Sequence, residues 1–92
     1  MSKERRRVYY SGRVQGVGFR FTSQRLAQGF EVSGYVRNLA DGRVELVVEG
    51  PPLAVSSFLD SIRAELGDKI HHAAVEEEPP GDPPLVGFSI RY

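Results

Sequence analysis

Hydrophobic and polar residues alternate with a period of two in several short segments of the chain. This alternation is typical of strands with one buried face. Residues 8–14 place Val8, Tyr10 and Val14 on one face. The same pattern, bounded by turn residues, predicts further strands at residues 32–38, 43–49, 70–76 and 87–92. On the later strands the residues expected to face inward are Val44, Leu46, Val48, Phe88, Ile90 and Tyr92.

Two segments have the spacing of helices instead. In residues 53–66 the apolar positions follow the i, i+3, i+4, i+7 pattern of a helix with one buried face, and Gly67 ends it. A shorter helix is predicted to begin at a cap formed by Thr22 or Ser23 and to end near Gly29. Asp41 and Gly42 mark a hairpin turn between the second and third strands.

The resulting order is β-α-β-β-α-β with one more strand at the end. This order predicts an α+β, ferredoxin-like split βαβ sandwich, with a mostly antiparallel sheet and both helices on one face. A chain of 92 residues has the length of one domain, so we expect a single domain over residues 1–92. The proline-rich stretch at residues 76–84 is expected to form an exposed loop.

Composition narrows the range of functions. Hydrophobic residues make up 40% and charged residues 26%, which excludes wholesale disorder. The formal net charge is zero, so a DNA or anionic-membrane partner is disfavoured. There is no cysteine, which excludes disulfides and thiolate chemistry. The charged N-terminus is not followed by an apolar run, so it is not a secretory signal, and we expect a cytoplasmic protein.

Charge is divided unevenly along the chain. Residues 1–46 carry a net charge of +5 and residues 47–92 a net charge of −5. A positive half suggests a small anionic ligand. The alternative is that the basic residues at positions 3 and 5–7 belong to a solvated tail, and residues 1–7 are expected to be flexible.

The segment Gly12-Arg-Val-Gln-Gly-Val-Gly-Phe-Arg20 follows the first strand and leads into a helix. Gly16 and Gly18 permit positive φ, so that successive N–H groups can form an anion-binding nest. The helix N-terminus adds further N–H groups, and Arg20 adds a planar fork that fits phosphate. The segment therefore predicts a cradle for a phosphate-sized anion. It is neither a dinucleotide fingerprint nor a P-loop, so a nucleotide ligand is weakly supported.

This segment resembles the first signature of the acylphosphatase family. Gly34-Tyr-Val-Arg-Asn38, continued by Gly42, Val44 and Gly50 at matching spacing, resembles the second. The resemblance extends from about Val8 to Tyr92. Two positions depart mildly from the family pattern: Tyr10 stands where an aliphatic residue is commoner, and Tyr35 where many members have tryptophan.

The resemblance implies hydrolysis of the carboxyl-phosphate bond of acyl phosphates to a carboxylate and inorganic phosphate. It implies that Arg20 binds the phosphoryl group and that Asn38 holds the attacking water. The backbone N–H groups expected to complete the cradle are those of Gln15, Gly16, Val17, Gly18, Phe19 and Arg20. The family needs no metal and no cofactor. The expected partner is a small acyl phosphate, with no nucleic acid and no membrane, and the chain is expected to be a monomer.

Two other functions are open to test. One is a module that binds phosphate without turnover, or that forms a piece of a larger carbamoyl-transfer maturation protein. The other is an RNA-binding sheet, which is disfavoured because residues 43–49 carry two acids and no aromatic. For Gln15 two roles are equally open: its side chain hydrogen-bonds the loop backbone, or it contacts the substrate. His71 and His72 face opposite ways on a strand, so they cannot chelate a metal together.

Overall fold

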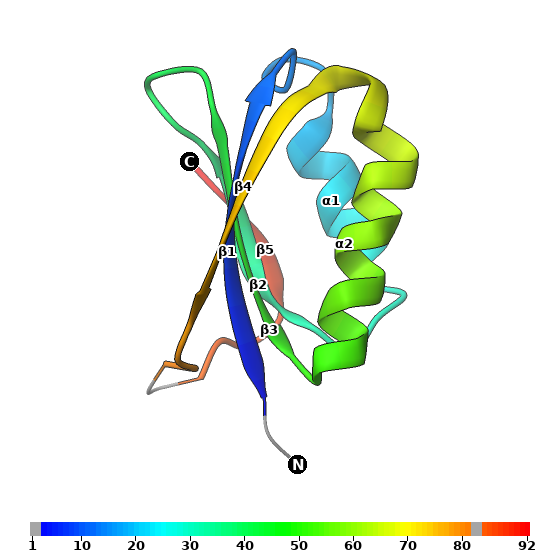
Figure 1. Ribbon diagram of the computed structural model, residues 1–92, viewed down its shortest axis with the longest axis vertical. Helices are drawn as coiled ribbons and strands as arrows, with labels where there is room; N and C mark the ends of the chain where they lie inside the picture. The colour runs from blue at the N-terminus through cyan, green and yellow to red at the C-terminus, as the bar shows by residue number, and fades with distance from the viewer. Residues whose placement is uncertain (1–2, 82–83) are drawn as a thin grey trace.

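The structure, a computed structural model, describes residues 3–81 and 84–92 and has two layers. A five-stranded sheet forms one layer, and two helices cover one of its faces (Figure 1). The strands are β1 (Glu4–Gly12), β2 (Ser33–Asn38), β3 (Val44–Gly50), β4 (Ile70–Glu78) and β5 (Phe88–Arg91). The helices are α1 (Phe19–Ala27), α2 (Pro52–Leu66) and a short 3₁₀ turn, η1 (Gly67–Lys69). None of the helices in these ranges is long and apolar enough to cross a membrane.

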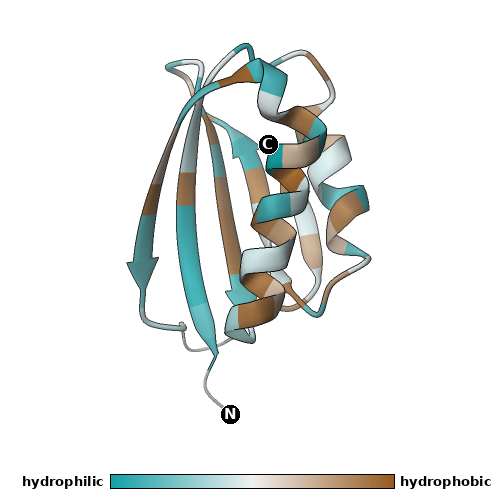
Figure 2. Ribbon diagram, turned by 45° about the vertical axis from the view of Figure 1, so that its right-hand side comes forward, coloured by the Kyte–Doolittle hydropathy of each residue, from teal (hydrophilic) through white to brown (hydrophobic). Residues whose placement is uncertain are grey.

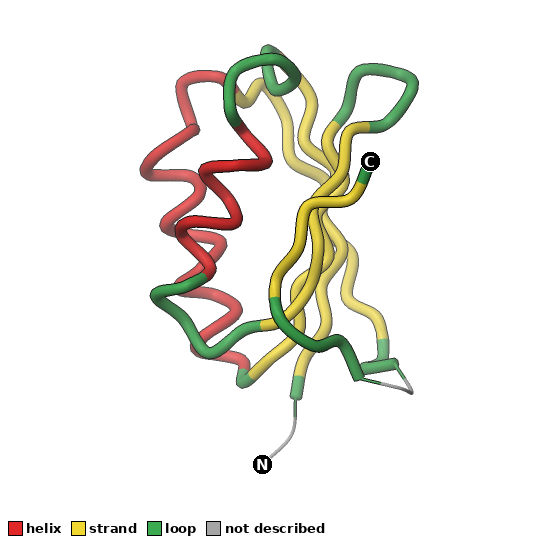
Figure 3. The backbone as a smooth tube through the Cα atoms, turned by 180° about the vertical axis from the view of Figure 1, so that it is seen from behind, coloured by secondary structure: helices red, strands yellow, loops and turns green. Residues whose placement is uncertain are grey.

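The strand order in the sheet is β4-β1-β3-β2-β5. The pairs β1–β3, β1–β4 and β2–β3 are antiparallel, and β2–β5 is parallel. Seen from behind, the same two layers leave one face of the sheet without a helix (Figure 3). The predicted ferredoxin-like α+β plan, with both helices on one face, is therefore confirmed.

The apolar core lies between the helices and the sheet. Hydrophobic and hydrophilic segments alternate along α2, as the periodicity predicts (Figure 2). The core includes Val8, Tyr10 and Val14, which the alternation of residues 8–14 placed on one face. It also includes Val55, Phe58 and Ile62 from α2. Phe58 packs against Phe30 and Phe88, with ring centroids 6.0 and 5.3 Å away. Burial of these rings fixes both helices on the sheet.

The expectation of a flexible basic tail over residues 1–7 is wrong from Glu4 onward. β1 begins at Glu4, so Arg5 and Arg7 are paired in the sheet with both β3 and β4. Their side chains lie on the helix-free face, where the carboxylates of Glu45 and Glu49 neutralise them. Met1 and Ser2, the start of the expected tail, lie outside the described residues.

The expected start of the first helix is also wrong. α1 begins at Phe19, and Gly18 occupies the N-cap position with φ of +79°. The Thr22 N–H donates to the Gly18 carbonyl oxygen at 2.9 Å, and the Ser23 hydroxyl donates to the Phe19 carbonyl oxygen at 2.8 Å. Neither side chain caps the helix, because the left-handed glycine already turns the chain into it.

Two further expectations near the C-terminus need correction. Tyr92 is 97% exposed instead of facing inward, because β5 ends one residue earlier, at Arg91. Glu76–Glu78 extend β4 instead of beginning a loop. An edge strand accepts such charges, since its outer side faces solvent. The proline-rich loop begins only at Pro79, and its residues 82–83 lie outside the described residues.

Candidate active site

The loop of residues 13–18 joins β1 to α1 at one end of the sheet. Gly16 and Gly18 have φ of +76° and +79°, in the left-handed region that favours glycine. A Cβ atom at either position would meet nothing within 4 Å. Glycine is therefore favoured here because the backbone adopts positive φ, and not because a larger side chain would clash with a neighbour. Such a path directs successive N–H groups toward one concave side, which is the geometry of an anion-binding nest.

The N–H groups of this loop are available to a ligand. Within residues 3–81 and 84–92, the backbone N–H groups of residues 15–21 donate no hydrogen bond. α1 has no side-chain cap, and its first turn contains no acidic residue. The positive end of the helix dipole therefore adds to a group of unoccupied donors. Together these features create a local preference for an anion.

Gln15 fixes the loop to the neighbouring hairpin. Its Nε2 donates to the Leu39 carbonyl oxygen at 2.8 Å and to the Arg43 carbonyl oxygen at 3.0 Å. Both hydrogens of the amide group are thus used, which leaves none for a substrate. Of the two roles open for Gln15, the structure shows the loop-holding one.

A hollow of about 180 Å³ lies beside this loop. It brings Arg20, in the first turn of α1, together with Asn38, the last residue of β2. Of the predicted cradle, Gly16, Gly18 and Phe19 also line the hollow, whereas the side chains of Gln15 and Val17 do not. The remaining wall consists of Val14, Phe21, Ile90 and Tyr92.

The Arg20 guanidinium carries an unneutralised charge. It forms no ion pair and no side-chain hydrogen bond with any residue that the structure describes. Its Cζ lies 4.8 Å from the centroid of the Tyr92 ring, so the aromatic face supports it without occupying its donors. Sequence reasoning did not place Tyr92 here, because the alternation predicted an inward-facing core residue.

Asn38 contributes an acceptor without a partner. Its Oδ1 is buried and receives no hydrogen bond from any described residue. A buried oxygen without a partner costs about 1–3 kcal/mol, so its presence calls for a ligand or a bound molecule that donates to it. The neighbouring Arg37 faces the helix-free side, where it pairs with Glu45 at 2.6 Å.

The aromatic residues of this region separate into two groups. Tyr10 and Phe19 are buried in the core, with ring centroids 5.0 Å apart. Phe21, in contrast, is 70% exposed and forms part of the wall of the hollow. His71 and His72 are exposed on β4 at a distance from this hollow. Among the described residues, no group of three potential ligands could hold a metal ion.

The acylphosphatase family model matches residues 6–90. The chain belongs to the acylphosphatase family. The acylphosphatase of Yersinia pseudotuberculosis is 44% identical over 87 residues, which are 92% of each chain. That of Haloarcula marismortui is 40% identical over 92 residues and covers both chains completely. The crystal structure of acylphosphatase from Bacillus subtilis superposes with a TM-score of 0.85 at 35% identity, covering 97% of this chain and 99% of that chain.

Membership confirms the activity that the two sequence motifs implied. The chain is a hydrolase that acts on acid anhydrides, and it has acylphosphatase activity. Its substrate is a small acyl phosphate, and one product is inorganic phosphate. An acyl phosphate is a mixed anhydride with a good leaving group, so a site without a covalent nucleophile is chemically sufficient.

Proposed function

We propose that the hydrolysis takes place in the hollow between the β1–α1 loop and the end of β2. Arg20 and the backbone N–H groups of residues 15–20 bind the phosphoryl group. Asn38 holds a water that attacks phosphorus directly. The observation that carries the proposal is the pairing, in one hollow, of an unneutralised guanidinium with a buried oxygen that has no partner.

The phosphoryl group carries negative charge on its equatorial oxygens, and this charge must be balanced. The guanidinium of Arg20 presents a planar pair of donors that matches two of these oxygens. The loop N–H groups donate to the others, at a helix end whose dipole is positive. Since these donors are already in place, they stabilise the transition state without reorganising. No metal ion is required in this scheme, and we propose that turnover is metal-independent.

The attacking water needs an acceptor and a fixed direction. The Oδ1 atom of Asn38 supplies the acceptor, because it has no other donor among the described residues. A neutral amide suits this place better than a carboxylate, which would repel the anionic substrate. Electrons then flow from the water oxygen to phosphorus, and the P–O bond to the acyl oxygen breaks. The products are a carboxylate and inorganic phosphate, with a proton released to solvent.

The hollow also limits what is recognised. A volume of about 180 Å³ corresponds to roughly six water volumes of about 30 Å³ each. That space accommodates a phosphoryl group with its water, while a larger acyl group extends outward. We propose that several small acyl phosphates are accepted. We further propose that the chain acts as a cytoplasmic monomer, as one domain over residues 1–92, without nucleic acid or membrane.

The test is hydrolysis of benzoyl phosphate by the purified protein in excess EDTA and in water enriched in ¹⁸O. Direct attack at phosphorus predicts undiminished turnover with EDTA and one ¹⁸O atom in inorganic phosphate. Label in benzoate would show attack at the carbonyl carbon and would contradict the role given to Asn38. Loss of turnover in EDTA, restored by a divalent metal, would contradict metal independence.

A further inference from the structure

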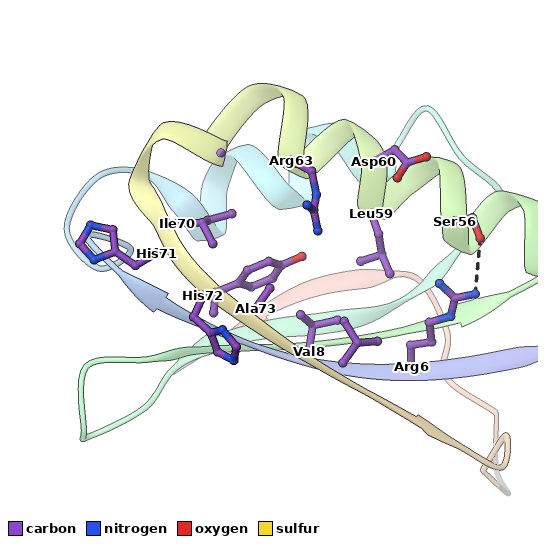
Figure 4. A pocket seen from close by; sticks show the side chains of 13 residues that line it. Arg6, Val8, Ser56, Leu59, Asp60, Arg63, Ile70, His71, His72 and Ala73 are labelled. Atoms are coloured by element: carbon purple, nitrogen blue, oxygen red, sulfur yellow. Dashed lines mark hydrogen bonds between the residues drawn. The ribbon is translucent and has the colours of Figure 1, made fainter.

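A second and larger cavity lies on the other side of the molecule from β5. It measures about 460 Å³, within the range of roughly 300–1,000 Å³ typical of small-ligand pockets. Figure 4 shows that α2 lies along one side and that β1 and the edge strand β4 lie along the other. It shares no lining residue with the hollow that contains Arg20. What this cavity binds is therefore a question separate from the proposed site of hydrolysis.

The first polar group of the cavity is the hydroxyl of Tyr10. Only 5% of this residue is exposed, and its hydroxyl forms no hydrogen bond with any described residue. Burial raises the pKa of Tyr10 well above its ordinary value, and the nearby positive charge of Arg63 opposes that shift only in part. The hydroxyl therefore stays protonated and, with no acceptor among the described residues, is available to donate to a ligand. Tyr10 is also a position at which the chain departs from the family signature.

The second polar group is the guanidinium of Arg63. Its side chain extends from α2 into the cavity, whereas the nearby Asp60 carboxylate points away from it (Figure 4). Arg63 forms no ion pair with the residues that the structure describes. Arg6, at one end of the cavity, is already engaged, because it donates to Glu4 at 2.7 Å and to the Ser56 hydroxyl at 3.4 Å. The solvent-exposed guanidinium of Arg63 is thus available to an anionic group in the cavity.

Five of the remaining lining residues are apolar, and the exposed His71 and His72 of β4 also border the cavity. In Figure 4 Leu59 extends from α2 and Val8 lies on the opposite side of the cavity, so apolar groups face it from both the helix and the sheet. The apolar floor consists of Val8, Leu59, Ile70, Ala73 and Val75. A ligand that fills the cavity must therefore have an apolar body and one end that accepts hydrogen bonds.

We propose that this cavity binds a small monocarboxylate with an aromatic or branched apolar body. Its carboxylate accepts hydrogen bonds from the Tyr10 hydroxyl and from Arg63, and its body lies on the apolar floor. A single free guanidinium balances one negative charge, which favours a carboxylate over a phosphate dianion. The neutral phenol adds direction and a second hydrogen bond without adding charge.

The test is a titration of the ¹⁵N-labelled protein with sodium benzoate, followed by amide chemical shifts. We expect saturable shifts around Leu59 and Ala73 with a dissociation constant on the order of 1 mM, and none in residues 15–20. Tyr10→Phe and Arg63→Gln should each weaken binding about tenfold, the effect of losing a hydrogen bond to a charged group. The exposed Arg25, which pairs with Glu65 at 2.8 Å, offers a matched control, and Arg25→Gln should leave the affinity unchanged.

Turnover of benzoyl phosphate distinguishes a local effect from misfolding, because neither Tyr10 nor Arg63 lies in the hollow of Arg20. Normal turnover in both variants, with weakened benzoate binding, supports the proposal. Benzyl alcohol has the same apolar body without the charge. Equal binding of benzyl alcohol and benzoate would overturn the carboxylate assignment. Shifts confined to residues 15–20, or no saturable shift, would overturn the site itself.

Discussion

Two regions of this molecule are rich in arginine, and they use it in opposite ways. On the helix-free face, Arg7 donates to Glu45 at 2.7 Å and to Glu78 at 3.1 Å, so its charge is balanced within the fold. At the β1–α1 loop, Arg20 has no acidic partner among the described residues and is supported by an aromatic ring instead. The first arginine holds strands together, whereas we propose that the second binds an anion from solution.

The difference shows that an excess of basic residues is a poor guide to ligand binding by itself. The N-terminal half of the chain has a net charge of +5, yet much of that excess is neutralised by acids from the other half. We propose that function at the β1–α1 loop depends on Arg20, which the fold leaves unpaired there. In a site lined by N–H groups, such an arginine can bind an anion without first breaking an existing ion pair.

The largest effect on turnover is expected from replacing Arg20. Arg20→Ala should lower turnover of benzoyl phosphate by about 10³-fold or more, because it removes the charge that faces the phosphoryl group. Arg20→Lys should fail to restore it, since a point charge cannot replace a bidentate fork. Initial rates monitored by loss of benzoyl phosphate give the measurement. Near-normal rates in Arg20→Lys would show that only the charge matters.

A smaller loss of turnover is expected at the other wall of the same hollow. Asn38→Ala should lower the rate by about 10²-fold, because the water loses its acceptor while the phosphate donors remain. Urea unfolding should show no loss of stability, since the variant removes a buried oxygen that has no partner. A marked loss of stability would mean that Asn38 serves the fold instead.

A substitution on the helix-free face should lower stability and leave turnover nearly unchanged, which is the opposite of the result expected for Asn38→Ala. Glu45 is 3% exposed and receives hydrogen bonds from Arg7 and Arg37 at 2.7 and 2.6 Å. Glu45→Gln should lower the free energy of unfolding by about 3 kcal/mol, the lower end of the range for a broken buried pair, because both arginines reach solvent. Turnover at a temperature where the variant is folded should stay within about twofold of normal. A large loss of turnover would link the two regions and contradict their separation.

Lowering the pH should destabilise the protein through the carboxylates of the helix-free face, with a smaller effect than the substitutions above. Burial raises the pKa of Glu45, but hydrogen bonds from Arg37 and Arg7 outweigh it and hold the pKa below its ordinary 4.5. For Glu49, burial is likewise outweighed by Arg5. A depressed pKa means that the stabilisation is present above about pH 4.5 and is lost as pH falls through the folded-state value. Urea unfolding from pH 7 to 3 should show this decline, and it should be smaller in Glu45→Gln.

Local patterns predicted most of this fold, and nonlocal contacts account for the errors. The strands, the second helix and both motifs depend on alternation, turns and spacing within short segments. The start of β1 was missed because Arg5 and Arg7 find their partners 38 to 71 residues away, at Glu45, Glu49 and Glu78. No local signal distinguishes such a strand from a solvated tail.

In the candidate site, too, sequence reasoning found the local motifs and missed the nonlocal contacts. Arg20, Asn38 and the glycines were found from motifs, because each motif is contiguous in sequence. Tyr92 was missed, since its place over Arg20 depends on where β5 ends. The two hydrogen bonds of Gln15 across the neighbouring hairpin, and the partnerless oxygen of Asn38, emerge only when the segments are brought together.

The most direct test of the account is to titrate inorganic phosphate into the wild-type protein and the two hollow variants by calorimetry, beside their turnover. Arg20→Ala should lose both phosphate binding and turnover. Asn38→Ala should lose turnover while its phosphate affinity stays within about threefold of wild type. Loss of phosphate binding in Asn38→Ala, or retention in Arg20→Ala, would contradict the division of roles between these two residues.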